Sequence, residues 1–273
     1  MKFFLEENNN DSYNNININE ELFRENVNII QENIDYQLIL QNSIMNEANG
    51  GDAMKNIKEF FKKIIEVIRN AIKSVMEFVK NTINKLQTNM ALNEKFLKKN
   101  KLAIESHVTK LSNEERTILD NRGAARFIAQ ELDKVDKALG SGKFYSGEVI
   151  GGLDDALSKA EKHVQNNNTI TLQSSSIIDD TIRFVREAID IAKENSDNIV
   201  KTLKRAENEA KKALSSQDKS EIANAKETVS EIRKVVSKIR ISVNTFIKYV
   251  HADARGHVSI AQKALNAAIN NKK

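Results

Sequence analysis

The chain has 273 residues, with 42 Lys and Arg against 38 Asp and Glu, and it contains no Pro, Cys or Trp. A proline-free chain of this length favours long helices over a turn-rich β fold. Without cysteine it can build neither a disulfide framework nor a cysteine-based metal site. Aromatic residues make up 5% and charged residues 29% of the sequence, a balance typical of helical bundles and coiled coils. We therefore predict an all-α fold, an extended multi-helix bundle ending in a long, coiled-coil-like antiparallel hairpin.

Charge divides the sequence near residue 47. Residues 1–47 carry Lys2 and Arg24 against nine acidic residues, a net charge of −7, and since the whole chain is +4, the remainder is +11. An acidic leader before a basic body suggests a segment that masks, targets or is removed, and ordinary charge fluctuation is the alternative. The first residues lack the apolar core of a secretion signal, and no window of eighteen uncharged apolar residues predicts a transmembrane helix.

The leader itself has two parts, and a break follows it. Residues 6–19 are Asn-rich and of low complexity, which predicts disorder. Residues 20–46 have apolar positions at helical spacing. Gly50 and Gly51 then break the pattern, and Asp52 can cap the helix that follows.

That next helix is predicted over residues 53–86. Its apolar residues recur every three or four positions, and its polar face carries eight cations against three acidic residues. The apolar stripe fits either the core-facing side of a bundle helix or a face that binds a membrane. If the helix meets an anionic surface, the contacting cations would be Lys55, Lys58, Lys62, Lys63, Arg69, Lys73 and Lys80.

The middle of the chain predicts shorter helices, at about 91–105, 113–139 and 153–166. Ser112 and Glu115 have capping-box spacing. Residues 140–152 hold five of the nine glycines and predict a loop. Gly142 and Lys143 resemble part of a phosphate-binding loop, but Phe144 replaces the Ser or Thr and no strand precedes them, so we interpret the segment as a linker.

The C-terminal region is the most regular. Two apolar seams with alternating spacings of four and three predict hairpin arms at about 176–214 and 219–250. Counting outward from the turn pairs Ala206 with Val229, Leu203 with Ile232 and Ile189 with Phe246. Around residues 251–257 the apolar pattern changes phase, which predicts a kink or a separate terminal helix. The predicted domains are the leader 1–47, a helical region 48–170, and the hairpin with its terminal helix, 171–273.

No residue pattern predicts catalysis, a cofactor or a metal site. The four histidines are scattered, and we expect them to be exposed to solvent. His251, Asp253 and His257, at i, i+2 and i+6, do not share one helix face. Residues 219–273 carry eleven cations against four acidic residues, which supports at most non-specific contact with DNA. The sequence predicts a protein that is not an enzyme.

One junction resembles a known processing signal. Met45, Glu47 and Ala48 follow the order of apolar residue, any residue, Glu and small residue. This resembles the sites at which the prohead protease of tailed bacteriophages cuts head proteins after Glu, although Met stands where Leu or Ile is usual. Val185, Glu187 and Ala188 match the same order. Internal head proteins of such phages carry a leader that directs them into the capsid and is removed there.

Three functions follow as hypotheses. The first is a non-enzymatic virion or internal head protein, cleaved between Glu47 and Ala48, made in the host cytoplasm and packed in the capsid with DNA or capsid proteins. The second is a membrane-active or pore-forming protein that binds anionic membranes through residues 53–86. The third is a coiled-coil scaffold or adaptor, whose hairpin binds a partner helix or a second copy of the chain.

Overall fold

The computed structural model describes residues 93–141, 145–172, 177–215 and 219–270, together with scattered positions between 59 and 88. The chain divides into two compact units, Met1–Val67 and Ile68–Lys273, and the elements below belong to the second. The predicted leader, the break at Gly50 and Gly51 and the bond between Glu47 and Ala48 lie outside the described residues.

The fold is all-α, as predicted. The helices are α3 (Lys101–Val108), α4 (Asn121–Ser141), α5 (Ser146–Gln165), α6 (Ile177–Ser215) and α7 (Lys219–Asn270). The strands β1 (Thr117–Leu119) and β2 (Thr169–Thr171) form a two-stranded antiparallel sheet. Residues 93–99 are also helical, and a turn at Asn100 separates them from α3. The helix expected at about 91–105 is therefore divided, and the Asn100 side chain donates to the Phe96 carbonyl at 2.9 Å.

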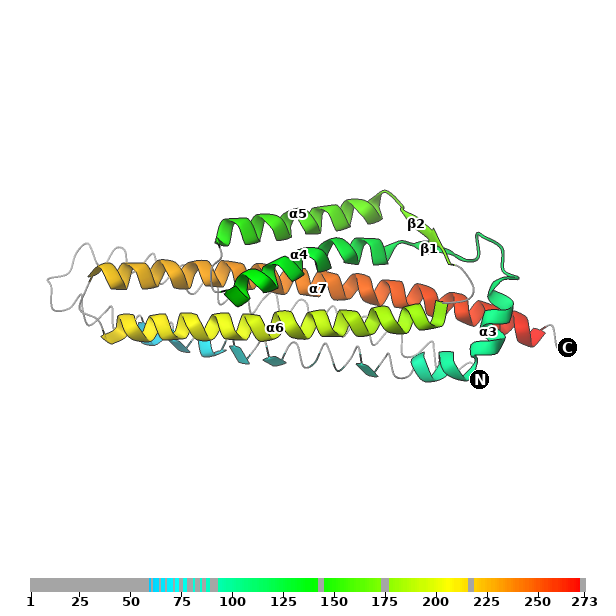
Figure 1. The fold of residues 1–273 in the computed structure, drawn as a ribbon, viewed down its shortest axis with the longest axis horizontal. Coiled ribbons are helices and arrows are strands. Elements are labelled where there is room, and N and C mark those ends of the chain that lie inside the picture. Colours follow the sequence, from blue (N-terminus) through cyan, green and yellow to red (C-terminus); the bar gives the residue numbers. More distant parts are fainter. Residues whose placement is uncertain are drawn as a thin grey trace. The chain divides into compact units, whose positions relative to one another are not determined.

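The long hairpin is formed by α6 and α7, which run antiparallel beside each other (Figure 1). All described members of the two predicted seams are buried, with at most 7% of each residue exposed. They are Ile178, Ile182, Val185, Ile189, Ala192, Ser196, Ile199, Leu203, Ala206 and Ala210 in α6, and Val229, Ile232, Val236, Ile239, Val243, Phe246 and Val250 in α7. The polar member, Ser196, donates its hydroxyl to the Ala192 carbonyl at 2.7 Å, so its burial leaves no unpaired donor. Hydrophobic burial along two matched faces holds this pair of helices together.

Helix α7 does not end near residue 250, and no separate terminal helix follows. It continues unbroken to Asn270. The spacing of buried residues also continues without a change of phase, because Asp253 and His257 occupy the seam positions between Val250 and Ile260. The change of phase that the apolar residues alone predicted does not occur.

The second hairpin, α4 and α5, is closed at its base by β1 and β2, which the sequence did not predict. Thr117 pairs with Thr171, and their hydroxyls lie 2.9 Å apart. The capping box does form: Ser112 N–H donates to Glu115 at 2.9 Å and Glu115 N–H donates to Ser112 Oγ at 3.2 Å. It closes a turn that leads into β1, not a helix. The helix expected at 113–139 starts only at Asn121, after Asp120 accepts the Gly123 N–H at 2.8 Å.

The loop predicted at 140–152 is also wrong over most of its length. Helix α4 extends to Ser141 and α5 begins at Ser146, so Gly147, Gly151 and Gly152 are helical. A Cβ on Gly152 would lie 2.2 Å from Glu131 Oε1, whereas one on Gly151 would meet nothing within 4 Å. Gly152 therefore allows α5 to lie close to the Glu131 side chain of α4. Packing within the hairpin therefore stabilises a helix in a glycine-rich segment whose intrinsic helix propensity is low.

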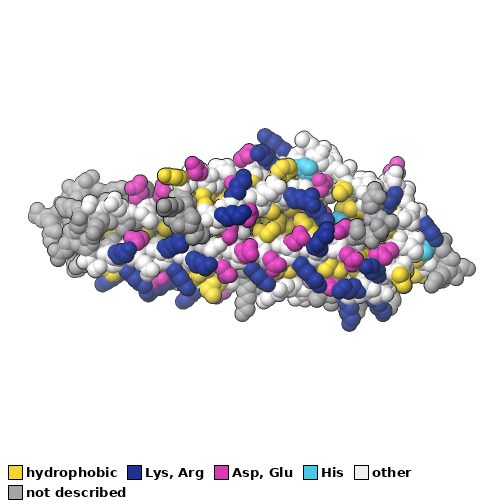
Figure 2. Space-filling view, in the orientation of Figure 1, with side chains coloured by type: hydrophobic (Ala, Val, Ile, Leu, Met, Phe, Trp, Pro, Cys, Tyr) yellow, Lys and Arg dark blue, Asp and Glu magenta, His cyan; other side chains and the backbone are white. Residues whose placement is uncertain are grey.

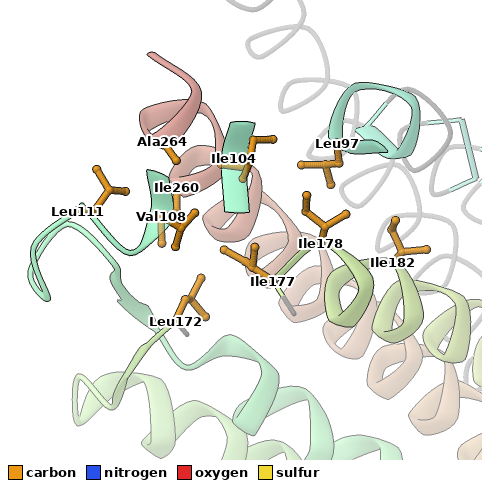
Figure 3. Close-up of a cluster of buried hydrophobic side chains, with 11 residues drawn as sticks. Leu97, Ile104, Val108, Leu111, Leu172, Ile177, Ile178, Ile182, Ile260 and Ala264 are labelled. Atoms are coloured by element: carbon orange, nitrogen blue, oxygen red, sulfur yellow. The ribbon is translucent and has the colours of Figure 1, made fainter. Parts of the chain in front are cut away.

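A hydrophobic cluster joins the elements at the base of this hairpin (Figure 3). It collects Ile104 and Val108 from α3, Ile260 and Ala264 from α7, and the start of α6. The remaining members are Leu97, Leu111, Leu172, Ile177, Ile178, Ile182 and Ala261. Ile118 of β1 packs against the cluster, and a Cβ on Gly256 would lie 3.0 Å from its Cδ1. Absence of a side chain at Gly256 lets β1 approach α7.

Candidate functional site

The cations predicted to contact an anionic surface are only partly described. Lys62, Lys63, Arg69 and Lys73 are exposed. Lys55, Lys58 and Lys80, like Glu47 and Ala48, lie outside the described residues. Arg69 is already engaged, because its Nε lies 2.9 Å from Glu207 Oε1 on α6, and Glu207 also pairs with Lys211 at 2.8 Å. Hydrogen bonds from Lys211 and Arg69 lower the pKa of Glu207, which keeps this carboxylate charged.

The apolar stripe of the same predicted helix is buried at its described N-terminal positions. Each described residue between 59 and 88 is helical, and Phe61, Ile65 and Ile68 are buried. Met76, further along the stripe, is 58% exposed. Burial of the stripe favours packing within the protein over contact with a bilayer. Within the described part of the chain, no helix has the length and apolar character needed to cross a membrane.

The most distinctive polar group of the described residues is a buried cluster between α4, α6 and α7. Arg122, in the first turn of α4, donates to Asp253 Oδ2 from Nε at 3.2 Å and from Nη2 at 2.9 Å. The Arg122 guanidinium also lies 4.5 Å from the ring centroid of Phe184 on α6, which is a cation–π distance. Asp253 is 1% exposed and its Oδ1 has no hydrogen-bond partner. We call Arg122, Phe184, Asp253 and His257 the polar cluster.

His257 completes the polar cluster with a defined donor and acceptor arrangement. Its Nδ1 lies 2.8 Å from the Asp253 carbonyl oxygen, so Nδ1 carries the proton and donates it. Its Nε2 faces Arg122 Nη2 at 3.5 Å, which requires Nε2 to be the acceptor. The Asp253 carboxylate is further from Nδ1, at 3.5 Å, and is occupied by Arg122. The Asp253 backbone carbonyl thus orients the imidazole, and the Asp253 carboxylate forms the ion pair between α4 and α7. In a catalytic triad, by contrast, the carboxylate itself orients the histidine ring.

Burial governs the charge of the two histidines in this part of α7. Burial lowers the pKa of His257 below its ordinary value of 6.5, and Arg122 lowers it further, whereas Asp253 and Asp180 raise it. Burial and the nearby Arg255 lower the pKa of His251 to about 4. The expectation that the histidines are exposed to solvent is therefore wrong for His257, which is 5% exposed.

A second polar group lies at the base of the α4–α5 hairpin. His163 Nε2 lies 2.9 Å from Asp120 Oδ2, and Phe127 meets the His163 ring edge-on at 5.7 Å between centroids. Asn168 donates to the His163 carbonyl at 2.8 Å. These contacts tie the end of α5 to the residue that caps α4. Together with the β1–β2 sheet, they stabilise the base of the α4–α5 hairpin.

Further polar contacts attach the α4–α5 hairpin to the long hairpin. Arg205 on α6 donates to the Leu139 carbonyl at the end of α4 at 3.1 Å. Asn198 on α6 donates to Asp136 on α4, and Lys238 on α7 pairs with Asp154 on α5. Polar contacts between the two hairpins are therefore distributed along α4 and α5, and the polar cluster lies near the start of α4.

Two observations bear on ligands. No group of three or more His, Cys, Asp or Glu side chains among the described residues could hold a metal ion. On the face drawn in Figure 2, Lys and Arg side chains are interspersed with Asp and Glu along the described helices. Interspersed charges of this kind form a solvated face and contribute little to stability pair by pair.

Comparisons with protein-family models, with curated proteins and with solved structures find no match to this chain. The sequence did not predict the polar cluster because Arg122 lies 131 residues from Asp253 and 135 residues from His257 in the chain. One signal was present: the spacing of four and three in α7 continues through residues 253 and 257 when it is followed regardless of residue type.

Proposed function

We propose that the chain is a non-enzymatic structural protein of a phage particle, an internal head protein whose acidic leader is removed between Glu47 and Ala48. The observation that carries the proposal is a coincidence of position. The match to the processing signal lies where a leader of net charge −7 meets a body of net charge +11, next to Gly50 and Gly51. A protease binds its substrate in an extended conformation, and glycines beside the bond leave the backbone free to adopt it.

The second match provides a contrast. Val185, Glu187 and Ala188 lie inside α6, and Val185 and Ala188 are 5% and 1% exposed. A protease could reach this bond only after local unfolding of a 39-residue helix. The match in α6 would therefore not be cut in the folded protein.

The body that remains after cleavage would be Ala48–Lys273, which is basic and carries the helices described above. Its charges are interspersed on the face shown in Figure 2, which favours contact with capsid proteins over a continuous phosphate-binding surface. In this proposal the protein is made in the host cytoplasm, enters the capsid with its leader, and lies inside the mature virion. Non-specific contact with packaged DNA would add to its retention there.

Mass spectrometry of tryptic peptides from purified particles tests the proposal. Trypsin cuts after Arg24 and Lys55, so the uncut chain yields a peptide 25–55 across the junction, while the processed chain yields Ala48–Lys55. We expect particles to contain Ala48–Lys55 and to lack the junction peptide. Peptides that place an N-terminus at Ala188 should be absent from the same sample.

A matched variant sharpens the test. Glu47→Gln removes the carboxylate that the signal requires, and we expect the uncut chain to persist in particles. Glu187→Gln, the equivalent change in α6, should leave processing unaltered. Particles that contain the junction peptide at full abundance, or that contain no peptide of this chain, would contradict the proposal.

A further inference from the structure

The polar cluster holds one ion pair and one neutral imidazole in a space shielded from water. Asp253 has a single negative charge, and Arg122 already neutralises it through two hydrogen bonds. Phe184 contributes only its ring face to Arg122. The cluster is therefore balanced when His257 is neutral and carries one unbalanced positive charge when His257 is protonated. An unbalanced charge in a buried site is costly.

The geometry makes the second proton harder to accept. In the neutral ring, Nδ1 donates to the Asp253 carbonyl and Nε2 faces the Arg122 N–H. A proton added at Nε2 would place a second donor against that N–H, since neither group can then accept. The contact between Nε2 and Arg122 Nη2 would change from a weak attraction to repulsion between two cations.

The charged groups around His257 come from three helices. Arg122 faces it from α4, Asp180 from α6, and Asp253 from α7 itself. Near this end of α7, α3 and β1 contribute apolar side chains, among them Ile104, Val108 and Ile118. Asp180 is already paired with Arg183 at 2.9 Å, which reduces its capacity to compensate a new charge. Asp253 remains the group that can pair with an imidazolium, because its Oδ2 lies 3.5 Å from Nδ1.

We propose that His257 is a proton-sensitive latch: in acid the imidazolium takes Asp253 from Arg122, and the first turns of α4 loosen from α7. Arg122 is 17% exposed in its side chain and lies near the start of α4, so it can turn to solvent when released. The other end of the hairpin stays attached, because Arg205 still binds the Leu139 carbonyl. The loosening is therefore a local change at the base of the α4–α5 hairpin, without unfolding of α6 and α7.

The sign of the pH dependence follows from burial. The pKa of His257 lies below 6.5 in the closed latch because burial disfavours the imidazolium, and pairing with an Asp253 carboxylate freed from Arg122 would raise it. The latch is therefore closed at neutral pH and opens as the pH falls. A latch that opened as the pH rises would contradict this assignment.

Distance measurements between two spin labels test the latch. The chain has no cysteine, so Arg126→Cys on α4 and Lys248→Cys on α7, both exposed positions, take labels at defined sites. Between about pH 7.5 and about pH 5, we expect the distance distribution to broaden and to shift to longer values, while helix content by circular dichroism is unchanged. An unchanged distribution down to the pH of global unfolding would overturn the proposal.

Four variants identify the group responsible. His257→Gln keeps an acceptor for Arg122 but cannot titrate, so the distribution should stay at its neutral-pH form. Arg122→Gln removes the cation and should also give a pH-independent distribution. It provides a second test if His257→Gln does not fold. His251→Gln and His163→Gln remove the neighbouring histidines and should retain the acid response. A response that survives both His257→Gln and Arg122→Gln, or that is lost in His251→Gln, would assign the effect elsewhere.

Discussion

The two helical hairpins of this chain are stabilised by different interactions. The α6–α7 hairpin is held by a continuous seam of buried Ile, Val, Leu, Ala and Phe. The α4–α5 hairpin is closed by two short strands and buries apolar residues of its own, among them Ile128, Leu132 and Leu153. It differs in that polar contacts add to this packing against α6 and α7, and the Arg122–Asp253 pair is the most buried of them. A seam depends on many small contributions, whereas a polar attachment depends on single groups and on their charge states. The difference predicts that the second hairpin can separate while the first remains folded.

The largest expected effect comes from breaking the seam. Ile239→Ala removes a fully buried side chain from α7 and should lower the free energy of unfolding by about 2–5 kcal/mol. Ile241→Ala, two residues away in the same helix, removes a side chain that is 45% exposed and should cost less than about 1 kcal/mol. Urea denaturation of both variants measures the difference. Equal losses would contradict the assignment of the seam.

Breaking the ion pair of the polar cluster should have an intermediate effect. Arg122→Met leaves Asp253 buried without its cation and should cost about 2–3 kcal/mol, less than for a fully buried pair because Arg122 is 17% exposed in its side chain. Arg183→Met breaks an exposed ion pair for comparison. The Arg183 side chain is 70% exposed and pairs with Asp180 on α6, so its loss should cost about 0.5 kcal/mol or less.

A double variant distinguishes loss of the pair from general damage to packing. Arg122→Met with Asp253→Leu removes both charges, so no buried carboxylate is left unpaired. We expect its stability loss in urea denaturation to be smaller than the sum of the two single losses. Additive losses would mean that the two residues act independently.

The smallest expected effect concerns neighbouring glycines in α5. Gly151→Ala places a methyl group in open space and should stabilise the helix by about 0.5–1 kcal/mol. Gly152→Ala gains the same propensity but must displace the Glu131 carboxylate, so its net effect should be close to zero. Thermal denaturation of the two variants compares them directly. A larger gain for Gly152→Ala would contradict the close packing of α4 and α5.

The apolar pattern of the sequence was sufficient to predict the long hairpin. Residues such as Leu203 and Ala206 are apolar, high in helix propensity and correctly spaced, so local pattern and tertiary packing agree. The terminal extension of α7 was misread at Asp253 and His257, where a polar residue occupies a buried position. Burial of such a residue depends on its partner, and the partner of Asp253 is 131 residues away in the chain.

The α4–α5 hairpin was harder to predict for a related reason. Strands β1 and β2 have three residues each, too few for a periodic signal. Gly147, Gly151 and Gly152 suggested a loop because their intrinsic preference opposes helix, which packing against α4 overrides. Tertiary contact, not local sequence, decides the structure of this hairpin.

Hydrogen exchange followed by mass spectrometry tests the central claim, that the two hairpins are held independently. In neutral buffer we expect amides of α4 and α5 to exchange through a partial opening, at a lower free energy than amides in the middle of α6 and α7. Arg122→Met should accelerate exchange in α4 and α5 and leave the protection of α6 and α7 almost unchanged. Equal protection of both hairpins, lost together in the variant, would contradict the account.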